Sequence, residues 1–207
     1  MSERRVANPL ALAVLACLAE RPMHPYEMAS TMRERQKDES IKLNYGSLYS
    51  VVEALARNQF IVPKETVREG NRPERTVFAL TEAGQHELSD WLSELLARPV
   101  KEFIRYEAGL SLMPALPPQD AAALLEARCD RLEIELAKAR SVEELVRGKN
   151  VARLFTIESE YRTAMRVAEL AWTRQLSADI VSGRLEGIDE WQSWYAGASI
   201  SKSPQRS

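Results

Sequence analysis

The segment from Asn44 to Ser50 gathers hydroxyl, amide and aromatic side chains at the start of a helical pattern. Apolar residues recur from Leu48 to Leu55 at helical spacing, which predicts one buried face and one polar face. Short polar and aromatic groups in the first turn of a helix are suited to reading base edges in the major groove of DNA. The predicted contacts from this helix are Asn44, Tyr45, Ser47, Tyr49 and Ser50.

Two neighbouring residues add phosphate chemistry to this helix. Lys42 lies just ahead of it and could reach a phosphate, and Gly46 lets the backbone approach one closely. The alternative is that Tyr45 and Tyr49 only pack against the preceding helices. The sequence leaves both interpretations open.

A second set of basic residues surrounds a polar turn between two period-two runs, residues 60–67 and 76–80. These runs predict two antiparallel strands, and glycine and proline mark the turn between them. Basic side chains on such a hairpin can contact backbone phosphate or enter the minor groove. The predicted contacts are Lys64, Arg68, Arg72 and Arg75, with Arg72 the strongest candidate because it lies near the tip. The alternative is a solvated hairpin whose arginines pair with glutamates across the strands.

Three predicted helices precede the strands. Asn8 followed by Pro9 is a typical helix start, and a second helix begins at Pro25, with Tyr26 among its inward-facing residues. The third begins near Tyr45. Three helices followed by a hairpin predict a winged helix-turn-helix over residues 1–98. This domain closes with a fourth helix, which starts at Thr81 and is stopped by the proline at residue 99. The predicted inner face of this fourth helix is Leu88, Trp91, Leu92, Leu95 and Leu96.

The second half, residues 99–198, predicts a domain of long helices, so the protein as a whole is mainly α. The span 100–112 is expected to be helical, residues 119–147 and 150–182 to form two long helices, and residues 199–207 to be a disordered tail. Apolar side chains on both long helices recur at spacings of three and four, as in coiled coils. We predict that they form a two-fold dimer through Leu125, Cys129, Leu132, Leu136, Ala139, Val146, Met165 and Trp172.

Several ordered motifs resemble the PadR family of bacterial transcriptional regulators. They are His24-Pro25-Tyr26-Glu27, Tyr45-Gly46-Ser47-Leu48-Tyr49, Arg72-Pro73-Glu74-Arg75 and Leu80-Thr81-Glu82-Ala83-Gly84. The resemblance covers about residues 10–90, and the two long helices look like the branch with a long C-terminal helical domain. Two positions depart from the family pattern. Gln59 stands where glycine is usual, so that Asn58 is expected to take the left-handed conformation instead, and Phe78 stands where tyrosine is common.

The resemblance implies a repressor that binds an inverted-repeat operator in double-stranded DNA as a homodimer and is released by a small ligand. Aromatic side chains could line a pocket for a small aromatic effector, although aromatic residues at helical spacing are more often core. The effector candidates are Trp91, Tyr106, Phe155 and Trp172.

Composition limits the other function classes. The 207 residues carry 28 basic and 30 acidic side chains, which gives a net charge of −2. Residues 42–80, the predicted DNA-binding part, hold a basic surplus of only two. We therefore expect modest non-specific attraction to DNA. The sequence lacks catalytic and cofactor motifs, which favours a protein without cofactors rather than an enzyme. The two cysteines are expected to be reduced core thiols, and the N-terminal apolar run is too short to span a membrane. We therefore expect a cytoplasmic protein. The remaining alternative is a winged-helix module for protein–protein assembly without specific DNA binding.

Overall fold

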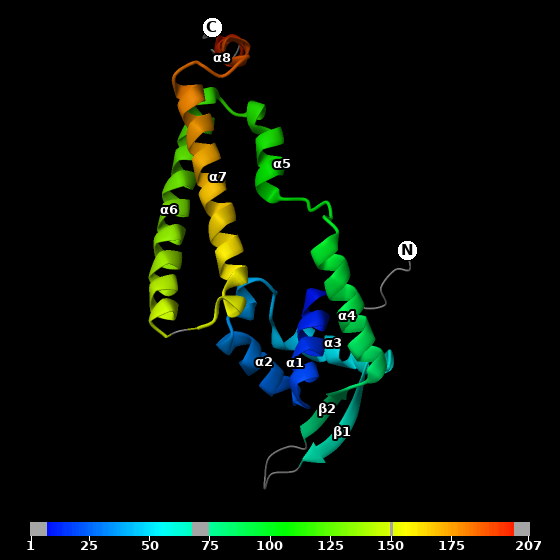
Figure 1. Ribbon diagram of the computed structural model, residues 1–207. Helices are drawn as coiled ribbons and strands as arrows, with labels where there is room; N and C mark the ends of the chain where they lie inside the picture. Colours follow the sequence, from blue (N-terminus) through cyan, green and yellow to red (C-terminus); the bar gives the residue numbers. More distant parts are fainter. Residues whose placement is uncertain (1–7, 68–74, 150, 201–207) are drawn as a thin grey trace. The chain divides into compact units, whose positions relative to one another are not determined.

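The chain divides into two compact units, Met1–Lys101 and Glu102–Ser207, in the computed structural model (Figure 1). The structure describes residues 8–67, 75–149 and 151–200. Most of the described residues are helical, and the two strands form one small sheet, which confirms the predicted mainly α fold with a winged helix. The first unit contains α1 (Pro9–Glu20), α2 (Pro25–Glu34), η1 (Lys37–Glu39), α3 (Tyr45–Arg57), β1 (Ile61–Val67), β2 (Arg75–Leu80) and α4 (Glu82–Ala97).

Local capping explains where the first helices begin. The Asn8 side chain accepts a hydrogen bond from the Leu10 amide at 2.9 Å, and Pro9 occupies the first helical position, where its missing N–H costs nothing. α2 likewise starts at Pro25, so both predicted starts are confirmed. The core of this unit lies among α1, α2, α3 and α4, and its fully buried large side chains include Leu10, Leu15, Met28, Leu48 and Leu55.

The wing is an antiparallel hairpin that is tied to the helices at its base. Ile61 pairs with Leu80 at one end and Val67 with Arg75 at the other. The backbones of Met23, between α1 and α2, and Phe78 exchange two hydrogen bonds of 3.1 and 3.0 Å. These bonds hold β2 against the helix-turn-helix.

The link from α3 to the wing corrects one expectation. Gln59, not Asn58, takes the left-handed conformation, with a φ of 61°, while Asn58 has a φ of −86°. Asn58 instead ends α3, where its side-chain amide donates to the Ala54 carbonyl at 2.8 Å. The position at which the family usually has glycine therefore keeps its unusual backbone in this chain.

α4 starts as predicted but buries less than predicted. Thr81 caps it by accepting from the Gly84 amide at 3.0 Å, and Leu88 and Trp91 are buried in the core. Beyond Trp91 the helix extends past that core, and three residues expected on its inner face are exposed. They are Leu92, Leu95 and Leu96.

The second unit contains a long helical hairpin. Its elements are α5 (Arg105–Ser111), η2 (Met113–Ala115), α6 (Pro118–Gly148), η3 (Arg153–Phe155), α7 (Ile157–Val181) and α8 (Ile188–Ile200). Helix is absent from residues 100–104, and α7 begins seven residues later than expected because Ala152 is extended and the chain turns back there. α8 continues two residues into the segment predicted to be a tail, and residues 201–207 lie outside the described residues.

α6 and α7 run side by side in opposite directions (Figure 1). Four residues predicted for a dimer interface, Leu125, Cys129, Leu132 and Leu136, are buried on α6, the helix that packs against α7. Their spacing is therefore explained by burial within a single chain and needs no second chain. Ala139 and Val146 are half-buried farther along α6.

Within the described part of the chain, every helix is too short or too polar to cross a membrane.

Candidate nucleic-acid interface

α3 presents one apolar and one polar face, as predicted. Leu48, Val51 and Val52 are buried against α1 and α2, whereas the side chains of Tyr45 and Tyr49 are 41% and 45% exposed. Tyrosines that only completed the core would lose nearly all of their exposed surface. Tyr45 and Tyr49 therefore leave a large part of their surface available to a ligand on the outside of the helix.

Two polar residues of this face also have structural roles. Asn44 caps α3, with its side-chain oxygen accepting from the Ser47 amide at 2.7 Å. The Ser50 hydroxyl donates to the Gly46 carbonyl at 3.1 Å. Asn44 thus sets where α3 begins, and this start determines which side chains share its first turn.

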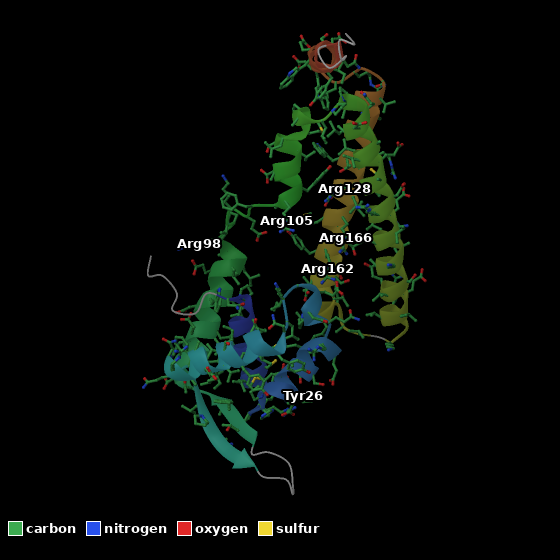
Figure 2. All side chains as sticks on the ribbon, turned by 180° about the vertical axis from the view of Figure 1, so that it is seen from behind. Tyr26, Arg98, Arg105, Arg128, Arg162 and Arg166 are labelled. Carbon is green, nitrogen blue, oxygen red and sulfur yellow. The ribbon has the colours of Figure 1, made fainter. Side chains whose placement is uncertain are left out.

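Tyr26 differs most from expectation. Predicted to face inward, it is 58% exposed and stacks on Tyr45, with ring centroids 6.0 Å apart and an interplanar angle of 11°. Figure 2 labels Tyr26 on α2. The Arg33 guanidinium lies 4.7 Å from the centroid of the Tyr45 ring and donates to its hydroxyl at 2.7 Å. Sequence reasoning missed Tyr26 and Arg33, because contacts across twelve or more residues leave no periodic signal.

The structure describes only some of the basic residues predicted to contact phosphate. Lys42 is exposed just ahead of α3, and Lys64 is exposed at a bulge in β1, where the pairing shifts between Pro63 and Glu65. A bulge turns a side chain out of the regular alternation of the strand. Arg75 pairs with Val67 through the backbone, and its side chain lies outside the described residues. Arg68 and Arg72 lie outside them entirely.

Two ion pairs brace the first two helices of the helix-turn-helix. The Arg35 guanidinium binds the Glu20 carboxylate, with one N–O distance of 2.8 Å, and hydrogen bonding to Arg35 lowers the pKa of Glu20. Arg21 pairs with Glu27 and lowers the pKa of that carboxyl in the same way. These pairs tie α1 and the segment after it to α2, so they fix the frame that carries α3.

The second unit contains a cleft of about 490 Å³ that is lined by apolar side chains and by arginine and glutamate side chains. Tyr106 lines it, and its hydroxyl is 2.8 Å from the Thr173 hydroxyl. The Arg128 guanidinium lies 3.6 Å from the centroid of the Tyr106 ring and donates to Glu169 at 2.6 Å. Figure 2 labels Arg128 on α6 and Arg166 on α7, and both line the cleft.

The four effector candidates have different surroundings within their own units. Trp172 meets Tyr106 edge to face, with centroids 6.5 Å apart. Trp91, in contrast, is buried in the core of the first unit, and Phe155 is exposed in η3 without lining the cleft. The structure thus pairs Tyr106 with Trp172 and gives Trp91 a packing role. The described residues include no group of three or more His, Cys, Asp or Glu side chains placed to hold a metal ion.

Comparisons with known proteins find a family model that matches part of the first unit. The profile of the transcriptional regulator PadR-like family matches residues 14–90, which confirms the resemblance in the sequence motifs. No curated protein matches the chain.

Solved structures share the fold over most of the chain. PadR from Bacillus subtilis in complex with operator DNA has a TM-score of 0.67 at 18% identity, covering 84% of this chain and 99% of that one. The same protein in complex with p-coumaric acid has a TM-score of 0.67 at 17% identity, and the match covers 83% of this chain and 98% of that one. The virulence activator AphA from Vibrio cholerae has a TM-score of 0.63 at 14% identity, and the match covers 84% of this chain and 98% of that one.

Proposed function

We propose, on the premise that residues 14–90 belong to the PadR-like family of transcriptional regulators, that this protein binds operator DNA through α3 and the wing. One observation carries the proposal. α3 buries its apolar face and leaves Tyr45, Tyr49 and Ser50 exposed at its N-terminal half. A major groove accepts one helix, and aromatic and hydroxyl groups of this length reach base edges and phosphates there.

The test is a gel shift with the DNA upstream of the protein's own gene. Tyr49→Ala is expected to weaken binding about tenfold per subunit, since a lost base contact costs about 1–3 kcal/mol. Lys42→Ala and Arg72→Ala should weaken binding to all sequences alike, because phosphate contacts carry no sequence information. Lys138→Ala, an exposed lysine on α6, is the matched control and should bind like the wild type. Unchanged binding by Tyr49→Ala would reject the role given to α3.

The assembly-module alternative makes the opposite prediction. A winged helix used only for protein contacts would bind operator and random DNA equally weakly, and the α3 variants would bind no differently. Competition between the upstream fragment and a scrambled fragment of equal length separates the two functions.

The proposed form of the regulator is a two-fold dimer, and α7 offers the surface for it. Ile157, Tyr161, Met165 and Trp172 recur at spacings of four or seven on α7 and are exposed, with Tyr161 66% and Trp172 52% accessible. A periodic apolar stripe that the chain itself leaves uncovered favours a helix of a second copy. Two wings held by a dimer would read an inverted repeat with half-sites about one DNA turn apart. Sedimentation as a monomer at micromolar concentration would contradict this.

The charge of the interface sets the expected salt dependence. Residues 42–80 have a basic surplus of only two, so each subunit is expected to neutralise few phosphates. With about three or four per subunit, log K of a dimer should fall with log salt at a slope of roughly −5 to −7. A slope near zero would exclude phosphate contacts as a main source of affinity.

The cleft beside Tyr106 supports release by a small aromatic effector. Its volume and apolar lining suit a single-ring compound. Of the three arginines that line it, Arg128 and Arg166 pair with Glu169 and Glu135, so Arg131 is the one placed to bind a carboxylate on that compound. A panel of aromatic acids added to the gel shift tests this. Release by one of them, lost in Tyr106→Ala but kept in Phe155→Ala, is the expected result, and release that survives Tyr106→Ala would place the effector elsewhere.

A further inference from the structure

The side of α2 that carries Tyr26 and Arg33 holds the first residue of α3 in place. Tyr26 and Arg33 are seven residues apart, about two helical turns, so they lie on the same side of α2. Tyr45 contacts both, stacking on the Tyr26 ring and receiving the Arg33 guanidinium at its own ring and hydroxyl. Tyr45 is thereby fixed by three interactions that all come from α2.

We propose that Arg33 is a positioning residue that locks Tyr45 against Tyr26, and that the locked pair forms a second DNA-contacting surface beside Tyr49. This inference rests on the proposed function and adds Tyr26 to its contacts. Tyr45 and Tyr49 are four residues apart on α3 and share a face, so the locked pair continues the exposed face of α3 onto α2. Two exposed tyrosine hydroxyls on a fixed platform can donate to backbone phosphates that flank the bases read by α3.

The positioning role needs an arginine rather than a lysine. The planar guanidinium can lie near a tyrosine ring and donate to its hydroxyl at once, whereas a lysine ammonium is a point charge. Among the described residues Arg33 has no carboxylate partner, so its interactions with Tyr45 are the ones that orient it. An unfixed Tyr45 would have to give up rotamer freedom when DNA binds, and this loss would reduce affinity.

The test compares Arg33→Lys with Arg57→Lys, a matched control at the far end of α3. Arg33→Lys keeps the charge and removes the guanidinium, so a phosphate contact would survive it and a lock would not. We expect operator affinity to fall about threefold to tenfold per subunit, with the salt slope unchanged, as for the loss of a cation–π contact and a hydrogen bond. Arg57→Lys should bind like the wild type. Wild-type affinity in Arg33→Lys would overturn the proposal.

A coupling measurement separates positioning from independent effects. Tyr45→Phe removes the hydroxyl that accepts from Arg33 but keeps the stacked ring. In the Tyr45→Phe background, Arg33→Lys should cost clearly less than it does alone, because part of the lock is already gone. Tyr26→Phe should weaken binding by removing a donor to phosphate. Fully additive losses of affinity at Arg33 and Tyr45 would overturn the positioning role of Arg33. Wild-type binding by Tyr26→Phe would overturn the DNA contact of Tyr26.

A DNA-free measurement keeps this inference separate from the proposed function. Contacts between the ring protons of Tyr26 and Tyr45 should appear in nuclear Overhauser spectra of the free wild-type protein and weaken strongly in Arg33→Lys. Their persistence in that variant would overturn the lock. If they weaken as expected but the wild type binds no DNA, the proposed function and the DNA role of the pair fail, and the lock stands.

Discussion

At the residue scale, the turn between α3 and the wing carries avoidable backbone strain. Gln59 has a φ of 61°, a conformation that costs a residue with a Cβ about 1 kcal/mol and glycine almost nothing. Gln59→Gly should therefore raise the free energy of unfolding of the first unit by about 0.5–1 kcal/mol, measured by urea denaturation. Asn58→Gly, one residue earlier, is the control. It should destabilise, because it removes the hydrogen bond to the Ala54 carbonyl at an ordinary φ.

Gly84 shows the opposite case, a position where only glycine fits. A Cβ at Gly84 would lie 2.1 Å from the Phe60 carbonyl oxygen and 2.7 Å from a methyl carbon of Leu80. Since a backbone atom cannot move aside cheaply, Gly84→Ala should lower the free energy of unfolding by about 3 kcal/mol. Gly46→Ala should leave the fold intact, because its nearest atom is 3.8 Å away. If Gly84→Ala melts like the wild type, α4 does not pack this closely on the start of the wing.

The two cysteines should behave as inert core thiols. Cys17 and Cys129 are free and buried, and burial raises the pKa of both thiols above the ordinary value. A raised pKa means less of the reactive thiolate at pH 8, so both should react slowly with a thiol reagent in the native protein and quickly in denaturant. Rapid labelling of a native thiol would show that its unit opens readily.

At the element scale, the stripe on α7 can be tested against another face of the same helix. Met165 and Val167 are both about half exposed, but two residues on a helix point in nearly opposite directions. Met165→Glu should convert the dimer to a monomer in analytical ultracentrifugation, because it buries a charge in the proposed interface. Val167→Glu should remain dimeric. If both variants remain dimeric, the stripe is not the dimer interface.

The α6–α7 pair also shows how one periodic pattern can serve two purposes. Spacings of three and four mark any face that packs against another helix, whether that helix belongs to the same chain or to a second one. Leu125 and Leu132 are buried within one chain, whereas Tyr161 and Trp172 are left uncovered. Only exposure in the folded unit distinguishes a core seam from a surface that is still available.

At the scale of the whole molecule, the first unit should fold without the second. Its core is built from α1 to α4 and β1, all within residues 9–97. A fragment of residues 1–101 should melt cooperatively but bind operator at least a hundredfold more weakly than the full chain, because it lacks the dimer that links two half-sites. Full affinity in the fragment would show that dimerisation does not contribute to binding.

Local signals in the sequence determined much of this protein. Helix starts at Asn8-Pro9 and Pro25, the capped start of α3, the two strands and the start of α4 are all set by residues within a few positions of one another. The motifs around Tyr45 and Gly84 were sufficient to suggest the PadR-like family, which the match over residues 14–90 supports. Capping, φ preference and periodicity are short-range effects, so they can be read along the chain.

The tertiary structure decided which side chains meet and which faces stay open. It turned Tyr26 outward onto Tyr45 and brought Arg33 to the same ring. It also covered Leu132 within one chain while it left Trp172 exposed. These outcomes depend on contacts between residues that are 12 or more positions apart. The sequence alone determined most of the elements and the resemblance of residues 14–90 to one family. Packing determined the surfaces, since burial depends on what the rest of the folded unit places over each residue.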